Sequence, residues 1–142
     1  MQTKPVTSVV IPAFNESARL KQTLVRVQAY FSRRGEPYEI IVVDDGSRDR
    51  TAETAARSAS GPGRWRILRN RRNRGKGASV RRGVAAARGR FVLFTDADLS
   101  TPIEEYGKLR RALQDGYDVA IASRAVADLS LIHISEPTRL RR

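Results

Sequence analysis

Two aspartates, Asp96 and Asp98, are separated by a single residue and directly follow an apolar run, FVLFT. Where the chain turns at the end of a strand, two carboxylates at this spacing can converge on one hard cation. Mg²⁺ and Mn²⁺ prefer such oxygen ligands, and they usually keep waters and substrate phosphates in their other positions. A metal that bridges a diphosphate neutralises charge on a departing nucleotide. The pair therefore predicts a Mg²⁺ or Mn²⁺ site; the alternative is a solvated turn, because Asp-x-Asp is common in loops.

A second acidic pair, Asp44 and Asp45, also follows an apolar run and precedes Gly46, which permits a tight turn. A carboxylate at this position can accept hydrogen bonds from a nucleobase edge or from a ribose. The alternative is helix capping by Asp45, Ser47 or Asp49, and for Asp49 capping is the preferred interpretation.

A basic segment without any acidic residue occupies positions 64–90 and contains eleven Lys and Arg side chains. Within it, NRGKG precedes a helical pattern, so Lys76 and backbone amides can meet a phosphate at the start of a helix. The loop is not a Walker A sequence, because Gly77 stands where Ser or Thr should follow Gly-Lys, and Val80 prevents a G-x-G-x-x-G match. Most of the arginines are expected to form a solvated basic face.

Short apolar runs alternate with helical patterns along the first 128 residues. Strands that are apolar on both faces and alternate with amphipathic helices are typical of a parallel sheet covered on both sides. Such sheets place ligand-binding loops at the carboxyl ends of their strands, where both acidic pairs fall. Arg124 follows the last strand and can clamp a phosphate, or can be a surface arginine without a ligand. The predicted strands are residues 6–11, 38–43, 65–68, 91–95 and 119–122, and the predicted helices are one capped by Asn15 with an apolar stripe at Leu20, Leu24, Val27 and Phe31, then residues 51–59, 78–87 and 102–114.

The composition limits the class of protein. The chain has 142 residues, a formal net charge of +12, one His and no Cys. The absence of Cys excludes a disulfide scaffold and a thiolate metal site, and it fits a reducing, cytoplasmic compartment. No apolar run approaches the roughly 20 residues of a membrane-spanning helix. The charge favours a polyanionic partner, which can be a phosphorylated substrate, an anionic membrane surface or a nucleic acid.

The last fourteen residues, 129–142, depart from the alternating pattern. The run LSLIHISEPTR resembles the in-frame translation of a transposase adapter used in short-read DNA library preparation. We therefore expect residues 1–128 to be the genuine part, cut short after the fifth strand, and the tail to be non-native. His133 is then not a candidate base. The alternative is a genuine C-terminal strand.

Five motifs occur in the order found in the family-2 glycosyltransferases of the GT-A fold, and the resemblance covers residues 7–126. The form of GKGASVRRG together with FTDADLSTP is most similar to dolichyl-phosphate or polyprenyl-phosphate glucose synthases. The resemblance implies an α/β fold with a Rossmann-like, mostly parallel sheet flanked by helices. It also implies transfer of glucose from UDP-glucose to a polyprenyl phosphate with inversion at the sugar. The motifs are SVVIPAFNES, EIIVVDDGSRDRT, NRGKGASVRRGVAAARG, FTDADLSTPIEE and DVAIASRA.

The resemblance also implies roles for particular residues. Asp98 would be the principal metal ligand, and Asp96 would face the ribose or the metal. Lys76 would lie near the diphosphate, and Arg124 would meet the acceptor phosphate. Ser100 stands where related mannose synthases often have a metal-binding Gln, which weakens a mannose interpretation. The nucleotide site would be lined by Pro12, Ala13, Asn15 and Glu16, with Asp45 reading the uracil and Asp44 beside it.

The chemistry agrees with these residue types. A phosphate acceptor is already anionic at neutral pH, so alignment, a metal for the UDP leaving group and positive charge matter more than a general base. We expect a nucleotide sugar, a lipid acceptor and the cytoplasmic face of a membrane as partners, and no nucleic acid. The alternatives are another donor or acceptor, such as GDP-mannose or a polysaccharide, and a basic nucleic-acid-binding module.

Overall fold

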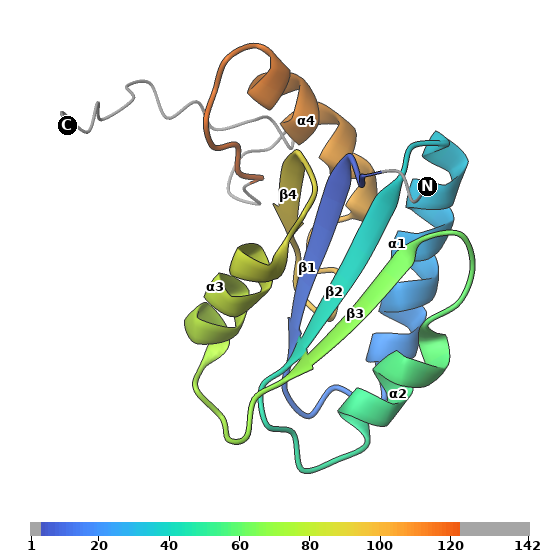
Figure 1. Cartoon of the computed structure of the whole chain (residues 1–142), viewed down its shortest axis with the longest axis vertical. Helices are drawn as coiled ribbons and strands as arrows, with labels where there is room; N and C mark the ends of the chain where they lie inside the picture. The colour runs from blue at the N-terminus through green and yellow to red at the C-terminus, as the bar shows by residue number, and fades with distance from the viewer. Residues whose placement is uncertain (1–3, 123–142) are drawn as a thin grey trace, which may run out of the picture. The chain divides into compact units, whose positions relative to one another are not determined.

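The computed structural model describes residues 4–122 and divides the chain into two compact units, Met1–Ile103 and Glu104–Arg142. The first unit is a parallel four-stranded sheet in the order β3-β2-β1-β4, with helices on both faces (Figure 1). Right-handed crossovers place α1 and α2 on one face, and the return from β3 to β4 places α3 on the other. The elements are β1 Thr7–Ala13, α1 Leu20–Arg34, β2 Tyr38–Asp44, α2 Thr51–Ser58, β3 Arg64–Arg69, α3 Lys76–Ala86 and β4 Phe91–Phe94.

The two central strands form the core of this unit. Every residue of β1 and β2 is buried, as expected for strands that are covered on both faces. The predicted apolar stripe of α1 is confirmed, because its buried residues include all four members: Leu20, Leu24, Val27 and Phe31.

The α3–β4 connection is tied to the amino ends of β1 and β2 by a buried polar cluster. The Glu39 carboxylate accepts hydrogen bonds from Ser8 Oγ at 2.5 Å and from the Arg88 N–H at 2.7 Å. Ser8 Oγ in turn accepts the Gly89 N–H at 2.8 Å. A buried carboxylate with several donors is well satisfied, so this cluster fixes the chain just beyond the C-terminal end of α3.

Helix α3 approaches the sheet through Gly83. A Cβ added there would lie 2.3 Å from Val10 Cγ1 and 3.2 Å from Val43 Cγ2, whereas one added at Gly77 on the same helix would meet no atom within 4 Å. Gly83→Ala is therefore expected to lower the free energy of unfolding by about 1–3 kcal/mol through overpacking. Gly77→Ala is expected to raise it by about 0.5–1 kcal/mol through helix propensity. Urea unfolding of both variants measures the two signs, and stabilisation by both changes would contradict the tight packing of Gly83.

Several elements differ from the sequence-based prediction. Helix α1 begins at Leu20 and not after Asn15, because Asn15 adopts a left-handed conformation with φ 53° in a loop. Helix α3 begins two residues earlier than predicted, at Lys76. The predicted fifth strand at residues 119–122 is wrong, since residues 119–121 have no regular structure and Ala122 forms only an isolated bridge.

The second unit contributes α4, Tyr106–Gln114, which follows a 3₁₀ turn at Ile103–Glu105. The helix predicted over residues 102–114 therefore starts with a tighter turn than an α-helix. No helix within residues 4–122 combines the length and the apolar character that crossing a membrane requires.

Candidate functional site

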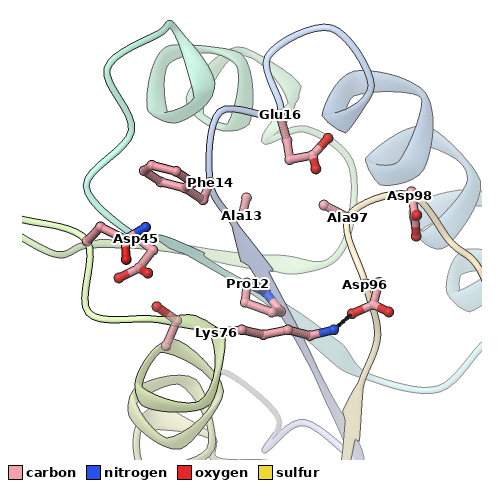
Figure 2. Close-up of a pocket in the computed structure, with 11 residues that line it drawn as sticks. Pro12, Ala13, Phe14, Glu16, Asp45, Lys76, Asp96, Ala97 and Asp98 are labelled. Carbon is pink, nitrogen blue, oxygen red and sulfur yellow. Dashed lines mark ion pairs between the residues drawn. The ribbon is translucent and has the colours of Figure 1, made fainter.

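A cavity of about 360 Å³ lies at the carboxyl ends of β1, β2 and β4, beside the start of α3 (Figure 2). The parallel sheet explains this placement, because the loops that leave adjacent parallel strands meet at one edge. Seven of the residues that the sequence predicted for the site line this cavity. The complete lining is Pro12, Ala13, Phe14, Glu16, Asp45, Asn73, Lys76, Ser79, Asp96, Ala97 and Asp98.

The two predicted metal ligands lie on one tight loop after β4. Leu99 turns this loop with a φ of 48°, and Ala97 O accepts a hydrogen bond from Thr23 Oγ1 of α1 at 2.5 Å. The turn brings the side chains of Asp96 and Asp98 to the same cavity instead of opposite faces of a strand (Figure 2). Within residues 4–122 no third acidic or His side chain joins them in a potential metal cluster.

Lys76 and Asp96 form an ion pair across the cavity. Lys76 Nζ lies 2.5 Å from Asp96 Oδ1, and it also lies 5.4 Å from the centre of the Phe94 ring (Figure 2). The other oxygen, Asp96 Oδ2, accepts a hydrogen bond from Ser100 Oγ at 3.2 Å. Ser100 also donates its backbone N–H to Asp98 Oδ1 at 2.9 Å, so one residue orients both carboxylates.

The buried Asp45 carboxylate holds the loop that leads into α3. Its Oδ1 accepts hydrogen bonds from Asn70 Nδ2 at 2.7 Å and from the Arg74 N–H at 3.0 Å, and its Oδ2 accepts the Gly75 N–H at 2.9 Å. Burial alone would raise the pKa of Asp45, but the hydrogen bonds from Asn70, Arg74, Ser79 and Gly75 together lower it. Asp45 therefore stays ionised at neutral pH and fixes the position from which Lys76 enters the cavity.

Asp44 and Asn15, which the resemblance places in the nucleotide site, do not line the cavity. Asp44 is fully buried, accepts the Ser47 N–H and pairs with Arg69 Nε at 3.1 Å. Adjacent residues at the end of a strand point in opposite directions, so only one carboxylate of this pair can face the cavity. Asn15 accepts the Arg48 N–H through its side-chain oxygen and holds its loop against the turn after β2.

Asp49 supports the loop on the β1 side of the cavity. Its carboxylate accepts hydrogen bonds from the Thr51 N–H at 3.0 Å and the Ser17 N–H at 3.1 Å. Partial burial would raise the pKa of Asp49, but the hydrogen bonds from Thr51 and Ser17 outweigh it and lower the pKa to about 2. Asp49 is not itself the N-cap residue of α2, which is Arg50, but it accepts the free N–H of Thr51, the first residue of the helix.

Four lining residues were not among the predicted site residues. Phe14 is an aromatic residue directly after β1; it lines the cavity and is 43% exposed, so its ring is available to stack against a flat ligand. Asn73 and Ser79 flank Lys76 in sequence, and Ala97 lies between the two aspartates. Arg124, His133 and the tail 129–142 lie outside the residues that the structure describes.

Comparisons with known proteins find matches that cover most of the length of the chain. The family model described as "Glycosyl transferase family 2" matches residues 8–140, a range that includes most of the segment interpreted as a non-native tail. The "Undecaprenyl-phosphate 4-deoxy-4-formamido-L-arabinose transferase" of Pseudomonas aeruginosa (strain LESB58) is 42% identical over 122 residues, covering 84% of this chain and 36% of the relative. The "Dolichyl-phosphate beta-glucosyltransferase" of Drosophila melanogaster is 42% identical over 133 residues, covering 83% and 40%.

A solved structure is also similar. Glucosyl-3-phosphoglycerate synthase from Mycobacterium tuberculosis, in complex with Mn²⁺, UDP and glucosyl-3-phosphoglycerate, aligns with a TM-score of 0.60 at 26% identity. The alignment covers 80% of this chain and 41% of that protein. The chain thus spans less than half the length of each of these three proteins.

Proposed function

The chain belongs to glycosyl transferase family 2, and from this premise we propose that the full-length protein moves glucose from UDP-glucose to a polyprenyl phosphate, with inversion at the sugar. The predicted fold class, an α/β GT-A domain with a mostly parallel sheet flanked by helices, is confirmed. The single observation that carries the proposal is the cavity in which Asp96 and Asp98 lie opposite Lys76 at the carboxyl end of the sheet.

This donor set fits a divalent cation. Asp98 would be the main ligand and Asp96 the second, and both offer the oxygen donors that Mg²⁺ and Mn²⁺ prefer. Two carboxylates leave room for waters and for a diphosphate in the remaining positions, which suits a cation that binds together with its substrate. When bound, the cation would supply positive charge to the UDP leaving group.

The remaining lining residues suit a nucleotide diphosphate. Lys76 is the first residue of α3, so its ammonium and the N-terminal amides of the helix both present positive charge to a phosphate. Asp45 lines the cavity, and its carboxylate can accept a hydrogen bond from an N–H of the base. Phe14 offers an aromatic face, and Pro12, Ala13 and Glu16 complete the wall beside it.

The proposed reaction needs no catalytic base. An oxygen of the acceptor phosphate attacks the anomeric carbon, the bond from that carbon to the UDP oxygen breaks, and the configuration inverts. The acceptor is already an anion, so the protein's contribution is alignment and charge stabilisation.

Arg124 is proposed to hold the acceptor phosphate. The exposed arginines of residues 64–90 are proposed to favour the anionic cytoplasmic face of a membrane, where the lipid acceptor resides.

The test is transfer by the full-length protein. Radiolabelled UDP-glucose, Mn²⁺ and polyprenyl phosphate in detergent are expected to give a glucose-labelled lipid, and UDP is expected to compete better than GDP. Preference for GDP would overturn the proposed donor, and no transfer from any nucleotide sugar would overturn the proposed reaction. Tight nucleic-acid binding that falls steeply with salt and ignores Mn²⁺ would support the nucleic-acid module instead.

A second donor is a specific alternative. The Pseudomonas aeruginosa relative, named for transfer of 4-deoxy-4-formamido-L-arabinose, is as identical to this chain as the Drosophila glucosyltransferase is. Offering both activated sugars to the same full-length protein separates the two donors. Dolichyl and undecaprenyl phosphates, compared at equal concentration, separate the two acceptors.

A further inference from the structure

The ion pair between Lys76 and Asp96 joins two groups that the proposed function assigns to different ligands. Lys76 would meet the diphosphate, whereas Asp96 would face the cation or the ribose. In the structure the two groups form an ion pair across the cavity, at 2.5 Å from Nζ to Oδ1 (Figure 2). A cation that approached Asp96 would therefore meet an ammonium group already in place.

We propose that Lys76 is an exchangeable counter-ion of Asp96: it keeps a divalent cation from binding tightly to the ligand-free site, and it turns to the diphosphate when the nucleotide enters. The inference rests on the proposed function and adds to it that cation and nucleotide bind cooperatively through this one side chain.

The partners of the two carboxylates explain the exclusion. Asp96 Oδ1 is occupied by Lys76 and Asp96 Oδ2 by Ser100 Oγ. Asp98 Oδ1 accepts the Ser100 N–H. A cation arriving alone would compete with Lys76 for its second carboxylate and would also be repelled by the ammonium charge. Because two carboxylates are a sparse donor set for a hard cation, the loss of one weakens binding strongly.

The environment of Lys76 explains why the exchange is easy. Its side chain is 60% exposed and that of Asp96 is 35% exposed, so breaking the pair costs little in a high-dielectric setting. The flexible side chain of lysine lets its compact ammonium group change position easily, whereas the planar guanidinium of arginine is more restricted. The backbone need not move, because Asp45 holds Gly75 and the Glu39 cluster holds the residues beyond α3. An arriving diphosphate offers Lys76 more negative charge than Asp96 does.

Reciprocity makes the inference measurable. If the nucleotide removes Lys76 from Asp96, it must tighten cation binding by the same factor by which the cation tightens nucleotide binding. Replacing Lys76 with an uncharged residue of similar length should weaken UDP binding and, at the same time, strengthen cation binding to the nucleotide-free protein.

The experiment measures Mn²⁺ binding to the full-length protein by electron paramagnetic resonance, with and without UDP. In Lys76→Met the Kd for Mn²⁺ alone is expected to fall by about fivefold or more, and the UDP-induced tightening is expected to shrink. Lys76→Gln serves as a second variant, and circular dichroism checks that both are folded. Lys108→Met is the matched control, because Lys108 also pairs with a carboxylate, Glu105 Oε2 at 3.0 Å, but does not line the cavity.

The results distinguish the counter-ion role of Lys76 from the proposed function. A tighter Mn²⁺ Kd without nucleotide in both Lys76 variants, but not in Lys108→Met, supports the exchange. An unchanged or weaker Kd in folded Lys76 variants, with UDP-dependent Mn²⁺ binding intact in the wild type, overturns the counter-ion role and leaves the proposed function standing. Wild-type protein that binds no Mn²⁺ even with UDP overturns both.

Discussion

Asp98→Ala in the full-length protein is expected to abolish the Mn²⁺-dependent part of UDP binding and to lower kcat/KM by about three orders of magnitude. Asp98 lines the cavity, its side chain is exposed, and its only hydrogen bond given by the structure within residues 4–122 is the one from the Ser100 N–H. The substitution should therefore weaken cation binding and leave the fold intact. Calorimetric titration of UDP in the presence and absence of Mn²⁺ measures the effect directly.

Asp118→Ala is the control for this change, because Asp118 is exposed, does not line the cavity and carries the same charge. Both variants should unfold within about 0.5 kcal/mol of the wild type, as is usual for exposed substitutions. If Asp98→Ala retained metal-dependent UDP binding, the assignment of the metal site to this loop would have to be abandoned.

The arrangement that creates the cavity could be predicted from the sequence. Continuous apolar runs such as VTSVVI and YEIIVV are typical of strands buried on both faces, and the structure buries all of β1 and β2. A parallel sheet necessarily brings the carboxyl ends of its strands to one edge. For that reason Asp45 and Asp96, which are 51 positions apart in the chain, could be placed in one site from the strand pattern alone.

The parts that could not be predicted depend on contacts between distant residues. The sequence offers Asn15 as a helix cap, but its loop is held by residues of the turn after β2, including Ser47 and Arg48. The pair Asp44 and Asp45 gives no local sign of which carboxylate faces the cavity, since this depends on where β2 ends. Residues 119–122 have a strand-like composition, but a strand also requires a partner, which composition does not specify.

Asp45→Asn is expected to destabilise the protein by about 3 kcal/mol and to raise the KM for the nucleotide sugar about tenfold or more. The change is nearly isosteric, but the carboxylate accepts N–H groups on both oxygens, from Asn70 and Arg74 on one and from Gly75 on the other. An amide supplies only one acceptor oxygen, so its NH₂ would point at a donor whichever way it turned. The loop that carries Lys76 should then loosen. Urea unfolding at pH 7 and hydrogen exchange of residues 71–76 measure the two effects, with exposed Asp118→Asn as the control.

The pH dependence of this effect has a definite sign. The pKa of Asp45 is lower in the folded protein than the usual 3.8, so the unfolded chain binds more protons in the acid range. The stability that Asp45 contributes is therefore complete above about pH 5, well above the unfolded pKa, and is lost as the pH falls through the lowered folded value. The difference in free energy of unfolding between the wild type and Asp45→Asn should narrow in acid.

Hydrogen exchange without nucleotide then separates two roles for Asp45. If Asp45 only contacted the base, Asp45→Asn would leave residues 71–76 as protected as in the wild type. If Asp45 holds this loop, the substitution should lower the protection of these residues before any nucleotide binds.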